Sequence, residues 1–118
     1  MRLNEVHYPD TPPVGGYGPG FFRIDGEVIN GGLLVLPGVR RSWSGYDDLT
    51  DILAAAPKID VLFVGTGNEI AHIPSDVRKA FDQADIGAEV MASPTACRTF
   101  NVLLGEGRRI GLAALPVI

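Results

Sequence analysis

The chain of 118 residues carries a formal net charge of −4 at pH 7, and 46% of its residues are hydrophobic and 20% charged. These values are typical of one globular domain that buries a core without disulfides or metals, and the negative charge disfavours a nucleic-acid partner. No apolar run approaches the roughly 20 residues of a membrane-spanning helix. The segment MRLNEVHYPD has the pattern of neither a secretory signal nor a transit peptide, so we expect a cytoplasmic protein of bacterial or archaeal type without an integral membrane segment.

Proline and glycine dominate the beginning of the chain. The stretch PDTPPVGGYGPG, residues 9–20, contains four prolines and four glycines, which excludes a helix. We therefore expect residues 1–20 to form an extended arm and residues 21–118 to form a single α/β domain.

The domain is expected to begin with strands. Asp25-Gly26 separates two apolar stretches and is a strong signal for a two-residue β-hairpin turn. The apolar run LLVLP predicts a third strand that Pro37-Gly38 ends, and VRRSW, residues 39–43, predicts a further short extended piece.

The apolar spacing then changes to the helical period. Leu49, Ile52, Leu53 and Ala56 form one helical stripe, and Val77, Ala80, Phe81 and Ala84 form another, after Pro74. A third helix is expected from Ser93-Pro94, with Ser93 as its N-cap, to about Leu104. Apolar strands at 60–64, 88–92 and 109–115 alternate with these helices, which predicts a three-layer α/β domain with a small additional layer from the first β-hairpin.

The segment VLFVGTGNEI joins an apolar strand to a Gly-Thr-Gly turn, as nucleotide-binding proteins do. A dinucleotide fingerprint needs a third glycine and an immediate helix, but Ile70 occupies the third position and the helix begins only near Pro74. Gly65 and Gly67 are alternatively explained as residues that let the chain leave the strand sharply.

A second kind of site remains open at this turn. The carboxyl ends of parallel strands share one edge of a sheet, where α/β proteins bind ligands. The turns at residues 65–68 and 93–98 would meet there and form a site for a small molecule or an anion. The candidate ligand-binding residues are Gly65, Thr66, Gly67, Asn68, Ser93, Thr95 and Arg98.

Catalytic and metal chemistry have little support. Cys97 is the single cysteine, so it excludes an internal disulfide, and it falls on the apolar stripe with Phe100, which favours packing over nucleophilic catalysis. His7 and His72 have no ligand spacing. We expect no metal, no cofactor and no catalytic residue.

The basic pairs Arg40-Arg41 and Arg108-Arg109 are interpreted as solvated strand ends, with an anionic partner as the alternative.

Three segments carry a family resemblance: FFRIDGEVINGGLLVLPG, LFVGTGNEI and, most specifically, SPTACRTFNVLLGEGRRIGLAALP. Together they resemble the family of the mitochondrial respiratory complex I assembly factor (the third NADH:ubiquinone oxidoreductase assembly factor) and its uncharacterised bacterial and archaeal relatives, an Mth-type domain of unknown function. The resemblance implies a β layer, a central mixed sheet and helices, with the last strand antiparallel to its neighbours. It also implies binding to other assembly proteins rather than catalysis.

Two functions follow as hypotheses. The first is a non-enzymatic protein-binding role in the assembly of a membrane-associated or respiratory complex, with Tyr17, Trp43 and Tyr46 as candidate partner contacts because aromatic residues are enriched in interfaces. The alternative is a small-molecule or anion-binding protein, or a weak enzyme, that uses the edge formed by the turns at 65–68 and 93–98. A structural subunit with an apolar oligomer surface is a third possibility.

Overall fold

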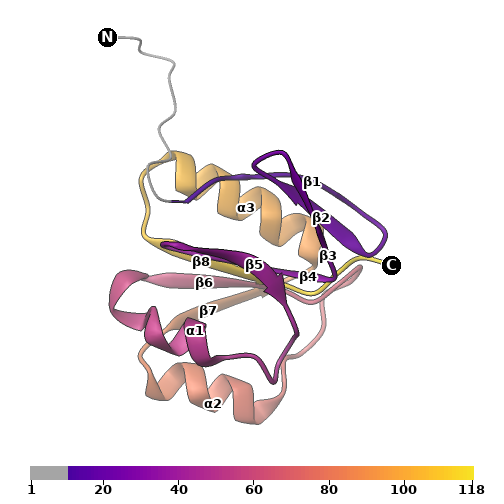
Figure 1. Ribbon diagram of the computed structural model, residues 1–118. Coiled ribbons are helices and arrows are strands. Elements are labelled where there is room, and N and C mark those ends of the chain that lie inside the picture. The colour runs from indigo at the N-terminus through magenta and orange to yellow at the C-terminus, as the bar shows by residue number, and fades with distance from the viewer. Residues whose placement is uncertain (1–10) are drawn as a thin grey trace, which may run out of the picture.

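Residues 11–118 are described by a computed structural model, in which two β-sheets and their helices form three layers (Figure 1). The elements are β1 (Val14–Gly18), β2 (Phe21–Ile24), β3 (Glu27–Asn30), β4 (Gly32–Leu36), β5 (Val39–Trp43), α1 (Thr50–Ala54), the 3₁₀ turn η1 (Ala56–Lys58), β6 (Val61–Gly65), α2 (Ser75–Gln83), β7 (Gly87–Met91), α3 (Ser93–Gly105) and β8 (Ile110–Ala114). None of the helices in this part of the chain is long and apolar enough to cross a membrane.

The small sheet has the order β1-β2-β3 and is antiparallel. The predicted turn between β2 and β3 is confirmed, because both Asp25 (φ 53) and Gly26 (φ 78) have the positive φ that a type I′ hairpin turn requires. Residues 1–10 of the expected arm lie outside the described residues. Within its later part, β1 pairs with β2, and the Asn101 side chain of α3 bonds both the N–H and the carbonyl of Val14 at 2.8 Å.

The central sheet is mixed and has the order β5-β4-β8-β6-β7. β8 runs parallel to β6 and antiparallel to β4, so the expectation that the last strand is antiparallel to its neighbours is wrong on one side. The reason is the connection through α3, which returns the chain across the sheet and so delivers β8 in the direction of β6 and β7. The antiparallel part is the β4–β5 hairpin and its pairing with β8.

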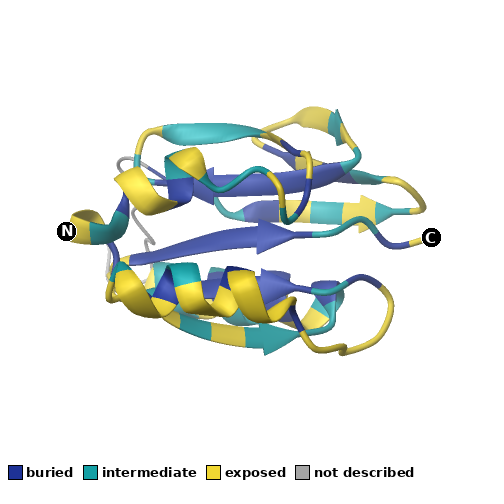
Figure 2. Ribbon diagram, turned by 90° about the horizontal axis from the view of Figure 1, so that it is seen from below, coloured by how far each residue is buried: buried dark blue, intermediate teal, exposed yellow. Residues whose placement is uncertain are grey.

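Each face of the central sheet has its own apolar core. The faces alternate along β6, where Leu62 and Val64 face α1 and α2, and Phe63 faces α3. Figure 2 shows the central strands of the sheet as buried along most of their length. This two-sided burial explains the continuous apolar run that the sequence shows.

The two faces of the central sheet are covered by different elements. α3 and the small sheet together cover one face, where Phe22 and Phe100 are completely buried, and burial of such a side chain stabilises the fold by about 1.5–3 kcal/mol. On the other face, α2 buries Val77 and Phe81 as its apolar stripe predicts. The first predicted helix is shorter than expected, because the chain tightens into η1 at Ala56, next to Pro57.

Candidate functional site

The turn after β6 and the start of α3 lie side by side, as the sequence predicts. β6 and β7 are parallel neighbours. The backbone N–H of Thr66 donates to the carbonyl of Met91 at 2.8 Å, and that of Ser93 donates to the carbonyl of Gly67 at 2.8 Å. We call this contact between residues 65–68 and the first turn of α3 the Gly65–Ser93 junction.

The C-terminal segment closes one side of the junction. The N–H of Leu115 donates to the carbonyl of Gly65 at 2.9 Å. The hydroxyl of Ser93 donates to the carbonyl of Leu115 at 2.6 Å and accepts from the N–H of Gly67 at 2.8 Å. Ser93 is fully buried. The prediction that Ser93 is the N-cap of α3 is therefore wrong: Ala92 is the N-cap, and the Ser93 side chain links three segments instead.

The two glycines of the turn have separate structural reasons. A Cβ at Gly65 would lie 2.7 Å from Oγ and 2.8 Å from Cα of Ser93, so only glycine lets β6 approach α3 this closely. Gly67 has a φ of 98°, a conformation that other residues rarely adopt. These contacts support the structural interpretation of the Gly-Thr-Gly motif.

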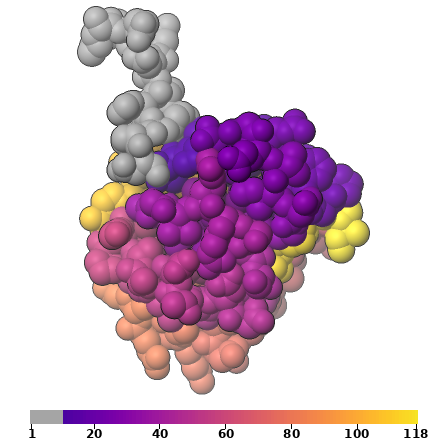
Figure 3. Space-filling view, viewed as in Figure 1, coloured from indigo at the N-terminus to yellow at the C-terminus, as the bar shows by residue number. Residues whose placement is uncertain are grey.

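The other polar residues of the turn also bond to the backbone. The Thr66 hydroxyl donates to the carbonyl of Glu69 at 2.7 Å and accepts from the N–H of Ala71 at 3.1 Å. Oδ1 of Asn68 accepts from the N–H of Ile118 at 2.7 Å, and its Nδ2 donates to the Ile118 carbonyl at 3.3 Å. These bonds hold residues 66–71 and the C-terminal segment in place, and Figure 3 shows that segment at the surface beside the N-terminal strands.

Thr95 and Arg98 lie apart from this network. Both are exposed on α3, and within residues 11–118 no side-chain hydrogen bond joins either of them to the turn. The predicted ligand-binding set is thus divided: Gly65, Thr66, Gly67, Asn68 and Ser93 form the junction, whereas Thr95 and Arg98 face solvent. Ligand binding at the junction stays a prediction.

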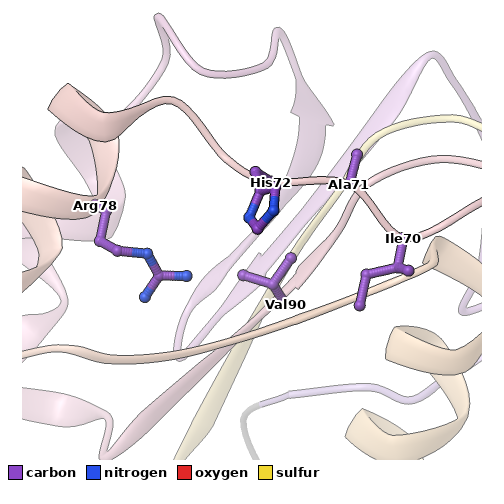
Figure 4. A pocket seen from close by; sticks show the side chains of 5 residues that line it. All are labelled: Ile70, Ala71, His72, Arg78 and Val90. Carbon is purple, nitrogen blue, oxygen red and sulfur yellow. The ribbon is translucent and has the colours of Figure 1, made fainter.

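A hollow of about 260 Å³ lies close to the junction, beyond the carboxyl end of β6 and against β7. We call it the Arg78 pocket. It is lined by Ile70, Ala71 and His72 of the loop after β6, by Arg78 of α2 and by Val90 of β7 (Figure 4). The sequence did not predict this site, because its lining residues belong to no motif. The signal available in the sequence was a pair of isoleucines, Ile70 and Ile73, in the loop between a strand and Pro74.

The three aromatic candidates for partner binding differ in exposure. Tyr17 is 46% exposed on β1, as a partner contact requires. Trp43 is only 3% exposed, and its indole N–H donates to the carbonyl of Asp48 at 2.8 Å, so it belongs to the core. Tyr46 is half-buried and packs edge-on against Trp43 with the ring centroids 5.8 Å apart, and burial raises the pKa of its hydroxyl.

The basic pair Arg40-Arg41 forms ion pairs within the chain. Arg40 bonds Asp25 at 2.7 Å in the small sheet, so it links the two sheets. Arg41 forms a two-pronged pair with Asp48, at 2.8 and 2.9 Å, and its Nε donates to Asp51 of α1 at 3.1 Å. The Arg41 guanidinium lowers the pKa of Asp48 from 3.8 to about 2. The interpretation of Arg40-Arg41 as a solvated strand end is therefore incomplete, because Arg41 connects β5 to α1.

Cys97 packs in the core under α3, as its place on the apolar stripe predicts. It is 4% exposed, and desolvation raises the pKa of its thiol to about 12. Because the thiolate is the nucleophilic form, this environment does not activate the sulfur.

The fold and the junction define the class of protein: a three-layer α/β domain with a mixed central sheet, in which the turn after a central strand is fixed by the C-terminal segment. The chain belongs to the family described as Protein of unknown function (DUF498/DUF598), whose model matches residues 14–115.

Relatives and a solved structure agree with this assignment. The chain is 46% identical over 117 residues to an uncharacterised protein of Rhodobacter capsulatus, with 99% of this chain and 94% of that protein covered. It is 32% identical over 123 residues to NADH dehydrogenase (ubiquinone) 1 alpha subcomplex assembly factor 3 of Rattus norvegicus, covering 98% of this chain but 66% of the rat protein. A crystal structure described as an outer membrane protein from Bartonella henselae superimposes with a TM-score of 0.85 at 30% identity, covering 95% of this chain and 100% of that one. The resemblance and the α/β fold inferred from the sequence are thereby confirmed.

Proposed function

We propose that the protein binds other proteins and helps to assemble or stabilise a membrane-associated complex, with a respiratory complex as the first candidate. The similarity to assembly factor 3, which extends over 98% of this chain, is the observation that carries the proposal. We place this activity in the cytoplasm. The chain spans about two thirds of the length of the rat factor, so the proposal concerns the shared domain.

The surface of the domain supports a binding role. Among the described residues, Tyr17, Val28 and Val102 are large hydrophobic side chains that are 46%, 52% and 60% exposed. Aromatic side chains such as Tyr17 are enriched in interfaces and often dominate their energetics. Trp43 is excluded from direct contact by its burial.

The test is affinity purification of the tagged chain from the cells that encode it, followed by mass spectrometry. We expect enrichment of subunits of one membrane-associated complex and less of that complex on native gels after deletion of the gene. Tyr17→Ser should weaken the enrichment, whereas Thr95→Ser, a milder change at an exposed position of α3, should not. Unchanged complex levels together with no enriched subunit would count against the proposal.

The alternative, a ligand site at the edge between residues 65–68 and 93–98, has weaker support. The polar groups of Thr66, Asn68 and Ser93 already bond to backbone atoms, so a ligand would have to displace these bonds.

A further inference from the structure

The Arg78 pocket combines cationic and apolar groups. In Figure 4 the Arg78 guanidinium extends from α2 toward His72 and Val90, while Ile70 forms the opposite wall. Residues from a loop, a helix and a strand therefore converge on one hollow. It lies beyond the carboxyl ends of parallel strands, the edge at which open α/β sheets place their ligands.

The charge of Arg78 is uncompensated among the described residues. Arg40, Arg41 and Arg109 each pair with a carboxylate, but within residues 11–118 no carboxylate pairs with Arg78. Glu69 precedes the lining segment, and neither it nor Asp76, in the first turn of α2, lines the pocket. The guanidinium is thus available for an anion, and its planar fork matches a carboxylate in two-pronged geometry.

Apart from His72, the remaining walls are apolar. Ile70 is 68% exposed. Covering an aliphatic side chain is favourable by about 25 cal/mol of free energy for each Å² of apolar surface removed from water. Ala71 and Val90 continue this surface into the hollow. An inorganic anion would leave these walls uncovered, whereas an anion with a hydrocarbon chain would cover them.

The volume limits the size of the ligand. Engineered apolar cavities of about 150 Å³ hold benzene, so about 260 Å³ suits a ligand of roughly six to ten non-hydrogen atoms. The pocket is smaller than the roughly 300–1,000 Å³ of drug-sized sites.

We propose that the Arg78 pocket binds a small aliphatic monocarboxylate. Its carboxylate pairs with the Arg78 guanidinium beside His72, and its hydrocarbon chain lies against Ile70, Ala71 and Val90. This site is independent of the proposed assembly role and lies outside the Gly65–Ser93 junction.

The experiment is a titration of the full ¹⁵N-labelled chain with isovalerate at constant ionic strength, followed by amide chemical shifts. We expect saturable shifts that centre on Ala71, His72 and Val90, with a Kd on the order of 1 mM, as seven ligand atoms and one charge-assisted pair allow. Isovaleramide, which has the same shape without the charge, should bind about tenfold more weakly or worse.

Matched variants locate the two parts of the site. Arg78→Gln should weaken isovalerate binding by about tenfold, and Ile70→Ser by about threefold, with spectra as dispersed as those of the parent chain. Lys79→Gln removes a neighbouring exposed charge outside the pocket and should change the Kd by less than about twofold. Shifts no larger than those produced by sodium chloride, equal binding of isovaleramide, or equal losses in the Arg78 and Lys79 variants would each overturn the proposal.

Discussion

Replacing Asp48 by asparagine tests the connection between β5 and α1. Asp48 accepts two bonds from Arg41, at 2.8 and 2.9 Å, and one from the backbone N–H of Ser44 at 3.1 Å. Its side chain is 17% exposed, whereas that of Arg41 is 36% exposed. Asparagine keeps the shape of the side chain but loses its charge, so the variant isolates the electrostatic part of this connection.

The lowered pKa of Asp48 determines how much stability the Asp48→Asn variant should lose. A fall from 3.8 to about 2 corresponds to about 2 kcal/mol of stability, at 1.36 kcal/mol for each pKa unit. Solvent around the more exposed Arg41 screens the pair, so we expect a loss of about 1–2 kcal/mol at pH 7. Because the pKa is lower in the folded state, this stability is present above pH 3.8 and is lost as the pH falls through 2.

The assay is urea unfolding of the parent chain and Asp48→Asn at pH 7 and pH 3. The difference in unfolding free energy should be about 1–2 kcal/mol at pH 7 and about half of that at pH 3. Asp47→Asn, in the exposed neighbouring residue, should cost less than about 0.5 kcal/mol. A difference that is independent of pH, or an equal loss in the Asp47 variant, would refute the reasoning.

Three further predictions concern the core and the junction. Gly65→Ala should destabilise the fold by about 1–3 kcal/mol in urea, because its Cβ would overlap Ser93, whereas Gly16→Ala, which meets no atom within 4 Å, should cost less than about 0.5 kcal/mol; equal effects would contradict the close approach. Ser93→Ala should cost about 1–3 kcal/mol by leaving a buried N–H and a carbonyl unpaired, and Thr95→Ala should be nearly neutral in the same urea unfolding assay. Cys97 should react with a thiol reagent at pH 8 only after addition of urea, and rapid reaction of the folded chain would show that the thiol is accessible.

Much of the fold follows from the sequence because local periodicity and turn chemistry determine it. Asp25-Gly26 specifies a turn with positive φ at both residues, and the hairpin forms there. The stripe of Val77 and Phe81 specifies the buried face of α2, and the stripe through Cys97 and Phe100 specifies that of α3. The sequence also predicted that residues 65–68 meet the start of α3 on the condition that the strands before them are parallel neighbours, and β6 and β7 meet this condition.

Tertiary structure alone determined the features that depend on contacts between distant parts of the chain. The direction of β8 depends on which strands it lies between, and the role of Ser93 depends on the carbonyl of Leu115, 22 positions away in the chain. The sequence alone offers Trp43 as a candidate partner contact, whereas the packed structure buries it in the core. The Arg78 pocket is the clearest case, because its walls come from three elements that share no spacing. Sequence patterns report the periodicity of one element, whereas a pocket depends on distances between elements.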